Sequence, residues 1–304
     1  MSLRSLRLCG KYAIASKRML TELAWRSILL TIVAITFSPL GNAQATGRSH
    51  QRAYLGFDAN DYPGDATLPQ FRKTFSFAGY WLNHPAGTPE GAPDTWLGHR
   101  AALAKQGFGF LVLFNGRLDK ELKAPADPRA IGTNDARDAA AIARREGFPA
   151  GTVIFLDQEE GGSMYDEQMA YLLAWFDGVV AHGFHAGIYC SGIPAGEGHG
   201  QFTVTANFVR ARAADRKIVY FVFNDACPPS PGCAYLANPP QPSASGVSFA
   251  SIWQFSQSPR RRKYTRHCSS TYARDGNCYA PGMGPGSPHI DTETSVSPDP
   301  SRAR

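Results

Sequence analysis

Two carboxylates stand at the end of one apolar run, in the stretch VIFLDQEEGG at residues 153–162. Asp157 and Glu159 are two positions apart, so on a strand they project to the same face with Cα atoms roughly 6.6 Å apart. In a concave site, each member of such a pair raises the proton affinity of the other, which keeps one acid protonated while the other is ionised. Glycoside hydrolysis needs an acid to protonate the leaving oxygen and an anion to support the oxocarbenium-like transition state.

A D-x-E motif alone is weak evidence, because acids after a strand also serve as loop residues or helix N-caps. A cleft is favoured by the polar and aromatic residues that recur near the ends of other strand-like runs. These residues are Asp58, Tyr80, Trp81, Asn115, Tyr189, Asn224, Trp253, Gln254 and Asp291. The aromatic members can stack on sugar rings, although a lone tryptophan such as Trp253 is more often packed in a core.

The elements that must position these residues are eight strand-like runs, most of them separated by helical patterns. The runs lie at 54–58, 75–83, 109–115, 152–157, 186–192, 217–224, 250–256 and 289–293. Helices are expected at 97–106, at 134–146 with Asn134 as the cap, from Asp166 onward, and at 203–214. In the third helix we expect one buried face, made by Met169, Leu172, Leu173, Phe176 and Val180.

Runs that are apolar on both faces indicate a parallel sheet. An open doubly wound sheet is the alternative, but eight units in this length favour an α/β fold of the (β/α)8 TIM-like barrel type, as a single domain. In such a barrel the chemistry lies at the carboxyl ends of the strands, where the polar residues named above are expected.

The first residues have the pattern of an export signal. Arg26 precedes an apolar run at 28–37, and Ala43-Gln44-Ala45 supplies a small-residue cleavage site. The run has ten residues, against roughly 20 needed to span a bilayer, so a retained membrane span is disfavoured. We therefore predict a signal peptide at 1–45 with translation starting at Met19, a linker at 46–52, the barrel at 53–297 and a disordered tail at 298–304.

The positive charge of the chain belongs mostly to the predicted leader. After residue 45 there are 25 basic and 24 acidic residues, so the charge gives no reason to expect nucleic-acid binding. The basic run at 260–263 is most simply a solvated loop, with contact to an anionic wall polymer as the alternative.

Five cysteines follow the predicted leader, which fits an oxidising compartment. The short spacings within CPPSPGC and CSSTYARDGNC favour two local disulfide loops, Cys227 with Cys233 and Cys268 with Cys278. Cys190 lies in an apolar strand and is expected to be a buried free thiol.

The sequence carries no sign of a metal or a cofactor. None of the eight histidines has metal-ligand spacing, and no CxxC pair occurs. Gly161-Gly162 predicts a tight turn, because no phosphate-binding motif follows it.

Several motifs in order resemble the family 25 lysozyme superfamily, and more closely its secreted glycoside hydrolase-like branch, a domain of unknown function. They are GFD on the first strand, Asp157-Gln158-Glu159 on the middle strand, GIYCSG on the next, WQFS late in the chain and a final Ile-Asp. The resemblance covers roughly residues 54–296 and implies the same barrel. The sequence departs from that of the lysozymes at 75–83, at 113–117 and in the long gap between Trp253 and Asp291.

Family 25 enzymes cut the β-1,4 bond between N-acetylmuramic acid and N-acetylglucosamine in peptidoglycan. By this resemblance Glu159 is the general acid, Asp157 stabilises or orients the reacting N-acetyl group, and Asp58 and Asp291 flank them. Tyr189 and Trp253 resemble, by position, the aromatic residues that this family places in the cleft and in the packing around it.

The resulting hypothesis is a protein of the cell envelope, periplasmic or secreted, that hydrolyses peptidoglycan with paired carboxylates and without a cofactor or metal. Two alternatives stay open. One is a non-catalytic glycan-binding module with the same cleft, and the other is a structural envelope protein whose acids only anchor loops.

Overall fold

The computed structural model describes residues 52–89 and 91–302, so the predicted signal peptide, the start at Met19 and most of the linker lie outside the described residues. The strands of the main sheet are β1 (Tyr54–Asp58), β2 (Phe77–Trp81), β3 (Gly109–Asn115), β4 (Val153–Asp157), β5 (His185–Ser191), β8 (Ile218–Phe223), β9 (Ile252–Ser256), β10 (Cys278–Tyr279) and β11 (His289–Ser295). A separate hairpin is formed by β6 (Ala195–Gly198) and β7 (Gln201–Thr203).

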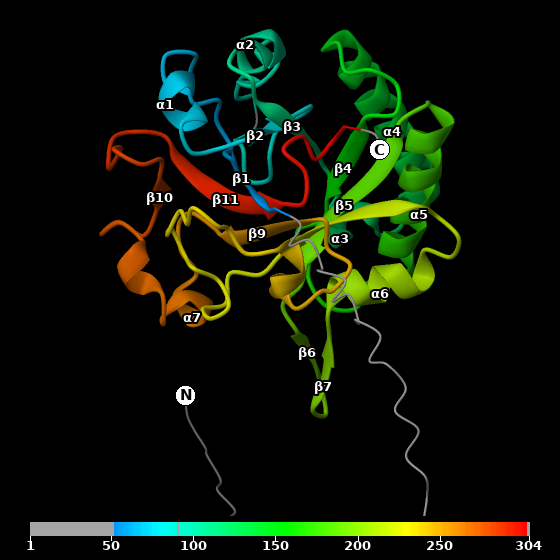
Figure 1. The fold of residues 1–304 in the computed structure, drawn as a ribbon. Helices are drawn as coiled ribbons and strands as arrows, with labels where there is room; N and C mark the ends of the chain where they lie inside the picture. The colour runs from blue at the N-terminus through cyan, green and yellow to red at the C-terminus, as the bar shows by residue number, and fades with distance from the viewer. Residues whose placement is uncertain (1–51, 90, 303–304) are drawn as a thin grey trace, which may run out of the picture. The chain divides into compact units, whose positions relative to one another are not determined.

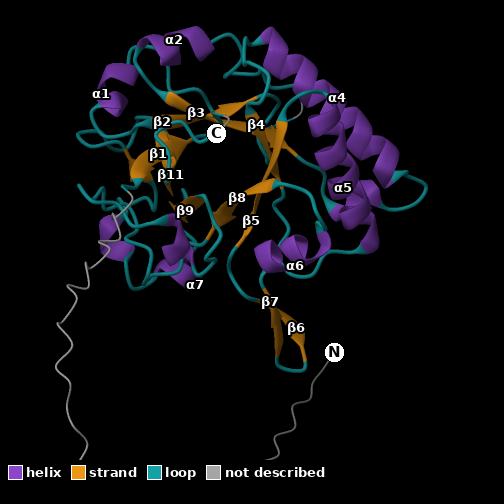
Figure 2. Cartoon of the chain, turned by 45° about the vertical axis from the view of Figure 1, so that its right-hand side comes forward, coloured by secondary structure: helices purple, strands orange, loops and turns teal. Residues whose placement is uncertain are grey.

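Eight of these strands close into a barrel, in the order β1-β2-β3-β4-β5-β8-β9-β11, because β11 also pairs with β1. Figure 2 shows the ring of strands with helices outside it. The predicted barrel is confirmed, with one difference in strand direction: β11 runs antiparallel to both of its neighbours. The chain enters β11 from the loops that follow β9 and reaches it without a crossover helix.

The helices are α1 (Leu68–Arg72), α2 (Arg100–Lys105), α3 (Asp119–Leu122), α4 (Pro128–Arg145), α5 (Asp166–Ala181), α6 (Thr205–Arg212) and α7 (Arg262–Thr265). Two 3-10 turns, η1 (Pro242–Ser245) and η2 (Ser269–Thr271), complete the elements. In Figure 1, α4 and α5 lie side by side on one flank of the barrel, and the β6–β7 hairpin projects away from it. None of the described helices is long and apolar enough to cross a membrane.

Two helix predictions need correction. Helix α4 begins at Pro128, earlier than the expected cap at Asn134, because Asp127 accepts hydrogen bonds from the backbone N–H groups of Arg129 and Ala130. Helix α5 packs against both the barrel and α4, and this packing buries Trp175 along with most of the expected face. Val180 was expected on that face but is 55% exposed.

The two disulfides join different cysteines from those expected. Cys227 is bonded to Cys268 and Cys233 to Cys278, with Cα separations of 5.5 and 5.4 Å. The predicted local pairs are wrong because the loop after β8 lies against the loop after β9, which makes partners across the two loops available. Cys190 is a buried free thiol, as predicted, and burial raises its pKa.

The predicted disordered tail is also wrong for residues 298–302. The backbone N–H of Phe110 donates to Asp299 Oδ1 at 2.9 Å, and the N–H of Val112 donates to Ser301 Oγ at 2.8 Å. The carbonyl oxygen of Ser301 accepts from Val153 N at 2.7 Å. The tail therefore occupies hydrogen-bonding groups at the start of β3 and β4, which would otherwise be unpaired.

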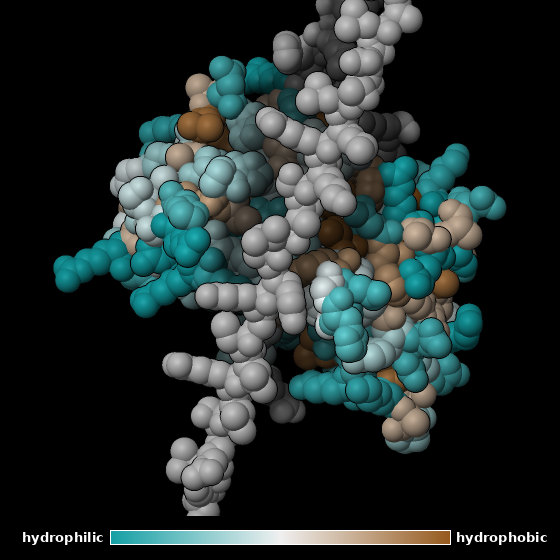
Figure 3. Space-filling view, turned by 90° about the horizontal axis from the view of Figure 1, so that it is seen from below, coloured by the Kyte–Doolittle hydropathy of each residue, from teal (hydrophilic) through white to brown (hydrophobic). Residues whose placement is uncertain are grey.

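The core fills the barrel and the layer between strands and helices. Strand residues alternate between the two sides, so Phe155 and Phe221 face the interior together with Asp157 and Tyr189. On the face shown in Figure 3, hydrophilic side chains occupy most of the described outer edge, with hydrophobic patches between them.

Candidate functional site

A cleft of about 370 Å³ opens at the carboxyl ends of the barrel strands. It is lined by Asp58, Asn60, Trp81, Ala86, Gly87, Leu113, Asp157, Glu159, Tyr189, Phe221, Gln254, Gln257, Ser258 and Asp291. We call it the acidic cleft, because its charged lining residues are four acids and no base. Seven of the residues singled out in the sequence line it: the four acids, Trp81, Tyr189 and Gln254.

Strand register brings two of the acids together from opposite ends of the chain. Asp58 on β1 is the direct partner of Asp291 on the antiparallel β11. A Cβ atom placed on Gly79 of the neighbouring β2 would lie 2.4 Å from the Cβ of Asp58, so only glycine leaves room for this acid. The closed barrel therefore fixes the position of Asp291 in spite of the long gap that precedes it.

A short hydrogen-bond chain orients the acids at the base of the cleft. The hydroxyl of Tyr189 donates to Gln254 Oε1 at 2.7 Å, so the amide nitrogen of Gln254 faces the carboxylates. That nitrogen donates to Asp58 Oδ2 at 3.0 Å and lies 3.4 Å from Asp291 Oδ2. The backbone N–H of Ser258 donates to Asp291 Oδ1 at 2.6 Å. Gln254 thus connects three strands of the site.

Asp157 lies deeper in the cleft than Glu159, the other member of the predicted catalytic pair. It is 4% exposed, and its Oδ1 has no hydrogen-bond partner among the described residues. Burial raises the pKa of Asp157 well above its ordinary value, and the charges of Glu159 and Asp58 raise it further. The indole N–H of Trp81, in the same cleft, also has no described partner. An unpaired acceptor and an unpaired donor in one cleft are typical of a site that a polar ligand completes.

Glu159 lies at the mouth of the cleft, where its side chain is exposed. The cleft walls still remove part of its hydration, and this desolvation raises the pKa of Glu159. Repulsion from Asp58 adds to the rise, and the nearby charge of Arg261 opposes it. An acid with a raised pKa that remains accessible can hold a proton and deliver it to a bound substrate.

Glu293 is an acid of this site that the sequence analysis missed. It lies on β11 two residues after Asp291, in register with Gly56 and Gln254, so its side chain faces the barrel interior below Asp58. It is 0% exposed, and burial and repulsion from Asp58 raise its pKa well above the ordinary value. When both acids are charged, neither oxygen of Glu293 has a partner, whereas a protonated Glu293 can donate to Asp58. The same D-x-E spacing that singled out Asp157 and Glu159 is present here and could have found it.

Four residues expected to bind substrate do not line the cleft. Tyr80 and Trp253 face outward from the barrel: the hydroxyl of Tyr80 donates to Glu146 Oε2 at 2.5 Å, and the indole N–H of Trp253 donates to the carbonyl oxygen of Asn224 at 2.8 Å. The side chain of Asn224 is itself bonded to the loop after β8. Asn115 ends β3 beside Asp157 but is not among the lining residues. Strand parity accounts for the two aromatic residues, because their neighbours Trp81 and Gln254 point inward.

A second cleft of about 210 Å³ adjoins the first and shares Glu159, Tyr189 and Gln257 with it. Its other lining residues are Gln158, Gly161, Ser191, Ile193, Pro194, Ala195, Phe223, Arg261 and Tyr264. Arg261 is its one cationic lining residue, so we call it the arginine cleft. The sequence had placed Arg261 in a basic run whose simplest interpretation was a solvated loop, and nothing local indicated that it faces a cleft.

The described residues contain no group of three or more histidine, cysteine, aspartate or glutamate side chains arranged to hold a metal ion. Asp58 and Asp291 are instead held by strand register, by Gln254 and by the backbone of Ser258.

Comparison with known proteins agrees with the resemblance stated from the motifs. Residues 76–211 match the model of the Rv2525c-like, glycoside hydrolase-like domain, a segment that includes Asp157, Glu159 and Tyr189. This match confirms the resemblance to a glycoside hydrolase-like domain. No curated protein matches the chain.

Three of the solved structures to which the chain is similar are as follows. An uncharacterized protein of B. stearothermophilus is 20% identical, with a TM-score of 0.49 over 79% of this chain and 94% of that one. The Mycobacterium tuberculosis Tat-secreted protein Rv2525c, solved in complex with HEPES, is 13% identical, with a TM-score of 0.46 over 82% and 96%. The Clostridium perfringens spore cortex lytic enzyme SleM is 12% identical, with a TM-score of 0.46 over 81% and 68%.

Proposed function

We propose that this protein, whose central part is a glycoside hydrolase-like domain, is an exported hydrolase of cell-wall glycan with muramidase-type action on peptidoglycan. The observation that carries the proposal is the convergence of Asp58, Asp157, Glu159 and Asp291 in one cleft, at the carboxyl ends of the parallel strands and the amino end of β11. Acids crowded in this way share protons, so protonated and ionised carboxyl groups coexist near neutral pH.

Glu159 takes the role of general acid and then general base. It is accessible from the cleft mouth and its pKa is raised, so it can protonate the glycosidic oxygen as the bond to the leaving sugar breaks. Asp157 takes the role of the anion that orients the 2-acetamido group of the substrate. In this substrate-assisted route the acetamido oxygen attacks the anomeric carbon and the enzyme forms no covalent bond of its own.

Substrate binding would itself determine which of Asp157 and Glu159 is ionised and which is protonated. An acetamido N–H that donates to the unpartnered Oδ1 of Asp157 stabilises the ionised form of that carboxyl group. The charge on Asp157 then favours the protonated form of Glu159, which is the form that the first step requires. In the second step ionised Glu159 removes a proton from water, and attack of that water on the anomeric carbon gives net retention.

The two disulfides fit an oxidising compartment, in keeping with the predicted export signal. The proposed chemistry uses the side chains of the chain and requires no cofactor or metal. The partner is a glycan, with sugar rings placed against Trp81 and Tyr189 in the cleft.

Release of reducing ends from purified peptidoglycan by residues 46–304, followed by mass spectrometry, tests this proposal. Wild type should release fragments, and Glu159→Gln should lose at least about 100-fold in rate while keeping its thermal stability. Glu160→Gln is the matched control, because Glu160 accepts bonds from Asp119 N and Gln168 Nε2 that an amide oxygen can also accept. Binding without release by wild type and Glu159→Gln alike would favour the glycan-binding module, and release that persists in Glu159→Gln would remove Glu159 from its role.

A further inference from the structure

The arginine cleft extends the acidic cleft on one side and differs from it in chemistry. The two meet at Glu159, Tyr189 and Gln257, so a glycan chain that passes Glu159 can extend from one cleft into the other. The charged residues that line the arginine cleft are Glu159 at the border and Arg261. The side of the proposed catalytic acid that faces this cleft therefore has a cation, where the other side has three further acids.

Arg261 is held in place on one edge and free on the other. Its Nη2 and Nε donate to the two carboxylate oxygens of Asp225, at 3.1 and 3.4 Å, and Asp225 is 0% exposed. The guanidinium lies over the ring of Phe223, 4.2 Å from the centroid, and 4.9 Å from that of Tyr264. Its Nη1 has no hydrogen-bond partner in the described part of the chain. A guanidinium fixed in this way presents N–H donors at a defined position with little loss of entropy on binding.

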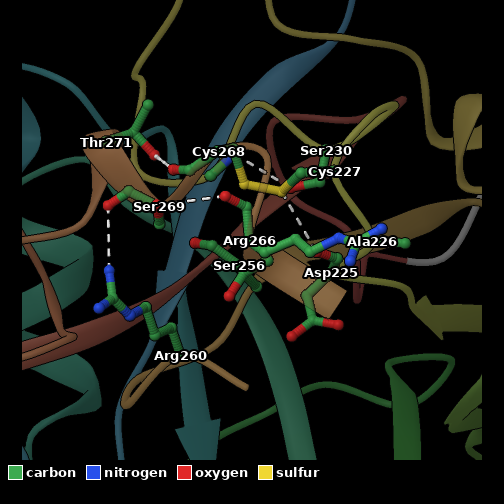
Figure 4. Close-up of a disulfide and its surroundings, with 12 residues drawn as sticks. Asp225, Ala226, Cys227, Ser230, Ser256, Arg260, Arg266, Cys268, Ser269 and Thr271 are labelled. Carbon is green, nitrogen blue, oxygen red and sulfur yellow. Dashed lines mark hydrogen bonds between the residues drawn. A yellow bond between two sulfur atoms is a disulfide. The ribbon is translucent and has the colours of Figure 1, made fainter. Parts of the chain in front are cut away.

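A disulfide fixes the segment that carries this pair. Cys227, two residues after Asp225, is bonded to Cys268, and its sulfur lies 3.4 Å from the carbonyl oxygen of Asp225. Arg260, next to Arg261, donates to the carbonyl oxygen of Ser269 beyond the disulfide at 3.1 Å, as Figure 4 shows. The backbone N–H of Cys227 donates to the carbonyl oxygen of Tyr264. The position of Arg261 is therefore determined by contacts across two loops.

A second observation in the same cleft indicates a polar ligand. Gln158 lines the cleft and is 1% exposed, and neither its amide nitrogen nor its amide oxygen has a described hydrogen-bond partner. Leaving both groups of a buried amide unpaired costs free energy that a bound oxygen-rich ligand can recover.

We propose that the arginine cleft is a subsite for a sugar that carries a carboxylate, which binds the free edge of Arg261, so that the protein selects acidic over neutral glycans. This inference rests on the proposed function and names its substrate class. A planar carboxylate fits the guanidinium fork. A dianionic phosphate is disfavoured, because Asp225 already neutralises Arg261 and Glu159 lies at the border. A neutral sugar can accept a hydrogen bond from the free edge of Arg261 but supplies no negative charge there.

Binding to two forms of one glycan tests the proposal. Peptidoglycan strands freed from their peptides expose the lactyl carboxylates of alternate sugars, and amidation of these carboxylates removes the charge while keeping the rings. Calorimetry with wild type and with Glu159→Gln, which separates binding from hydrolysis, should give roughly tenfold tighter binding of the carboxylate strands. Equal affinity of wild type for the two strands would overturn the inference, even if both are hydrolysed. A clear preference would uphold it even if neither is hydrolysed, in which case the proposed hydrolase function alone would fail.

Variants then assign the preference to Arg261. Arg261→Ala combined with Asp225→Asn removes both charges, so that no buried carboxylate is left unpaired, and it should bind the two strands within about twofold of each other. Arg262→Ala removes a charge from the next, exposed residue and should keep the preference. A preference that persists in the double variant, or that disappears in Arg262→Ala, would contradict the assignment. The comparison of the two strands on wild type stands independently of whether the double variant folds.

Discussion

The acidic cleft and the arginine cleft share Glu159 and Tyr189 but are built in different ways. The acidic cleft takes its charged residues from the ends of barrel strands, where register fixes Asp58 opposite Asp291. The arginine cleft takes its cation from the start of α7, in a loop that two disulfides hold. Strand pairing in the barrel thus fixes the positions of one group of side chains. The loops beside the barrel can carry a different charge and give a different selectivity.

The largest effect is expected in the acidic cleft, from Asp157→Asn. The amide keeps the shape of the side chain but cannot stabilise developing positive charge, so kcat should fall about 10²–10³-fold. Thermal stability at pH 7 should stay or rise, because the change removes a buried carboxyl group whose Oδ1 is unpartnered.

Turnover on peptidoglycan and a melting curve check both parts of this prediction. Asp138→Asn, an exposed change on α4, serves as the control and should alter neither value. Full turnover by Asp157→Asn would show that the acidic cleft does not depend on this anion.

The next effect concerns the arginine cleft alone. Replacing Cys227 and Cys268 by serine should lower the free energy of unfolding by about 2–4 kcal/mol. It should also reduce the preference for carboxylate strands, because Cys227 contacts Asp225, while the rate on amidated strands remains within a few-fold.

Replacing Cys233 and Cys278 by serine provides the comparison, measured by urea denaturation and strand binding. The two disulfides close loops of similar length, with sequence separations of 41 and 45, so chain entropy predicts a similar loss of stability. If only the first variant loses the preference, the contact to Asp225 is responsible. Equal loss in both would attribute the selectivity to the two disulfide-linked loops as a whole.

A smaller effect is expected from tryptophan variants, and it differs between the inner and outer faces of the barrel strands. Trp81→Phe removes an unpartnered indole N–H from the acidic cleft and should raise KM about 5–10-fold with little change in stability. Trp253→Phe, on the outer side, leaves the carbonyl oxygen of Asn224 without its donor and should cost about 1–2 kcal/mol of stability with unchanged kcat/KM. Kinetics and chemical denaturation of the two variants should give opposite patterns, and a KM effect at Trp253 would contradict the assignment of strand faces.

The smallest effect is a pH dependence of stability from the acids beneath and within the acidic cleft. The pKa values of Asp157, Asp291 and Glu293 are raised in the folded protein, so the folded state binds their protons more tightly than the unfolded chain does. Their contribution is present in full below the unfolded pKa, and it decreases as pH rises toward the folded pKa. Stability should therefore fall as the pH rises from 5 to 8.

Glu293→Gln tests this pH dependence and the role of the buried Glu293 carboxyl group in it. The amide can still donate to Asp58 but no longer titrates, so the fall in melting temperature between pH 5 and pH 8 should be shallower than in wild type. The preference for carboxylate strands, a property of the other cleft, should not change. An unchanged pH slope would show that Glu293 is not the group whose proton the fold retains.

The barrel was predictable because each strand carries its own local signal. Most of the eight runs, such as GFLVLFN, are apolar and bounded by polar or glycine residues, and all eight are strands in the structure. Seven of the eleven predicted catalytic and substrate-binding residues line the acidic cleft, because the carboxyl ends of the parallel strands meet at one edge. Antiparallel β11 brings Asp291 to the same edge from its amino end. Tyr80 and Trp253 were misplaced because an aromatic residue near a strand end faces inward or outward according to register, which composition does not reveal.

The sequence by itself determined the elements and the chemistry at their ends: the strand periodicity, the D-x-E pair of Asp157 and Glu159, and the presence of four cysteines able to pair. Only the tertiary structure decided which groups meet. It placed Asp291 opposite Asp58, put Glu293 beneath them, joined Cys227 to Cys268 and turned Arg261 toward the cleft. The physical reason is that hydrophobic period and local propensity act over a few residues, whereas closure of the barrel and the packing of two loops join residues far apart in the chain.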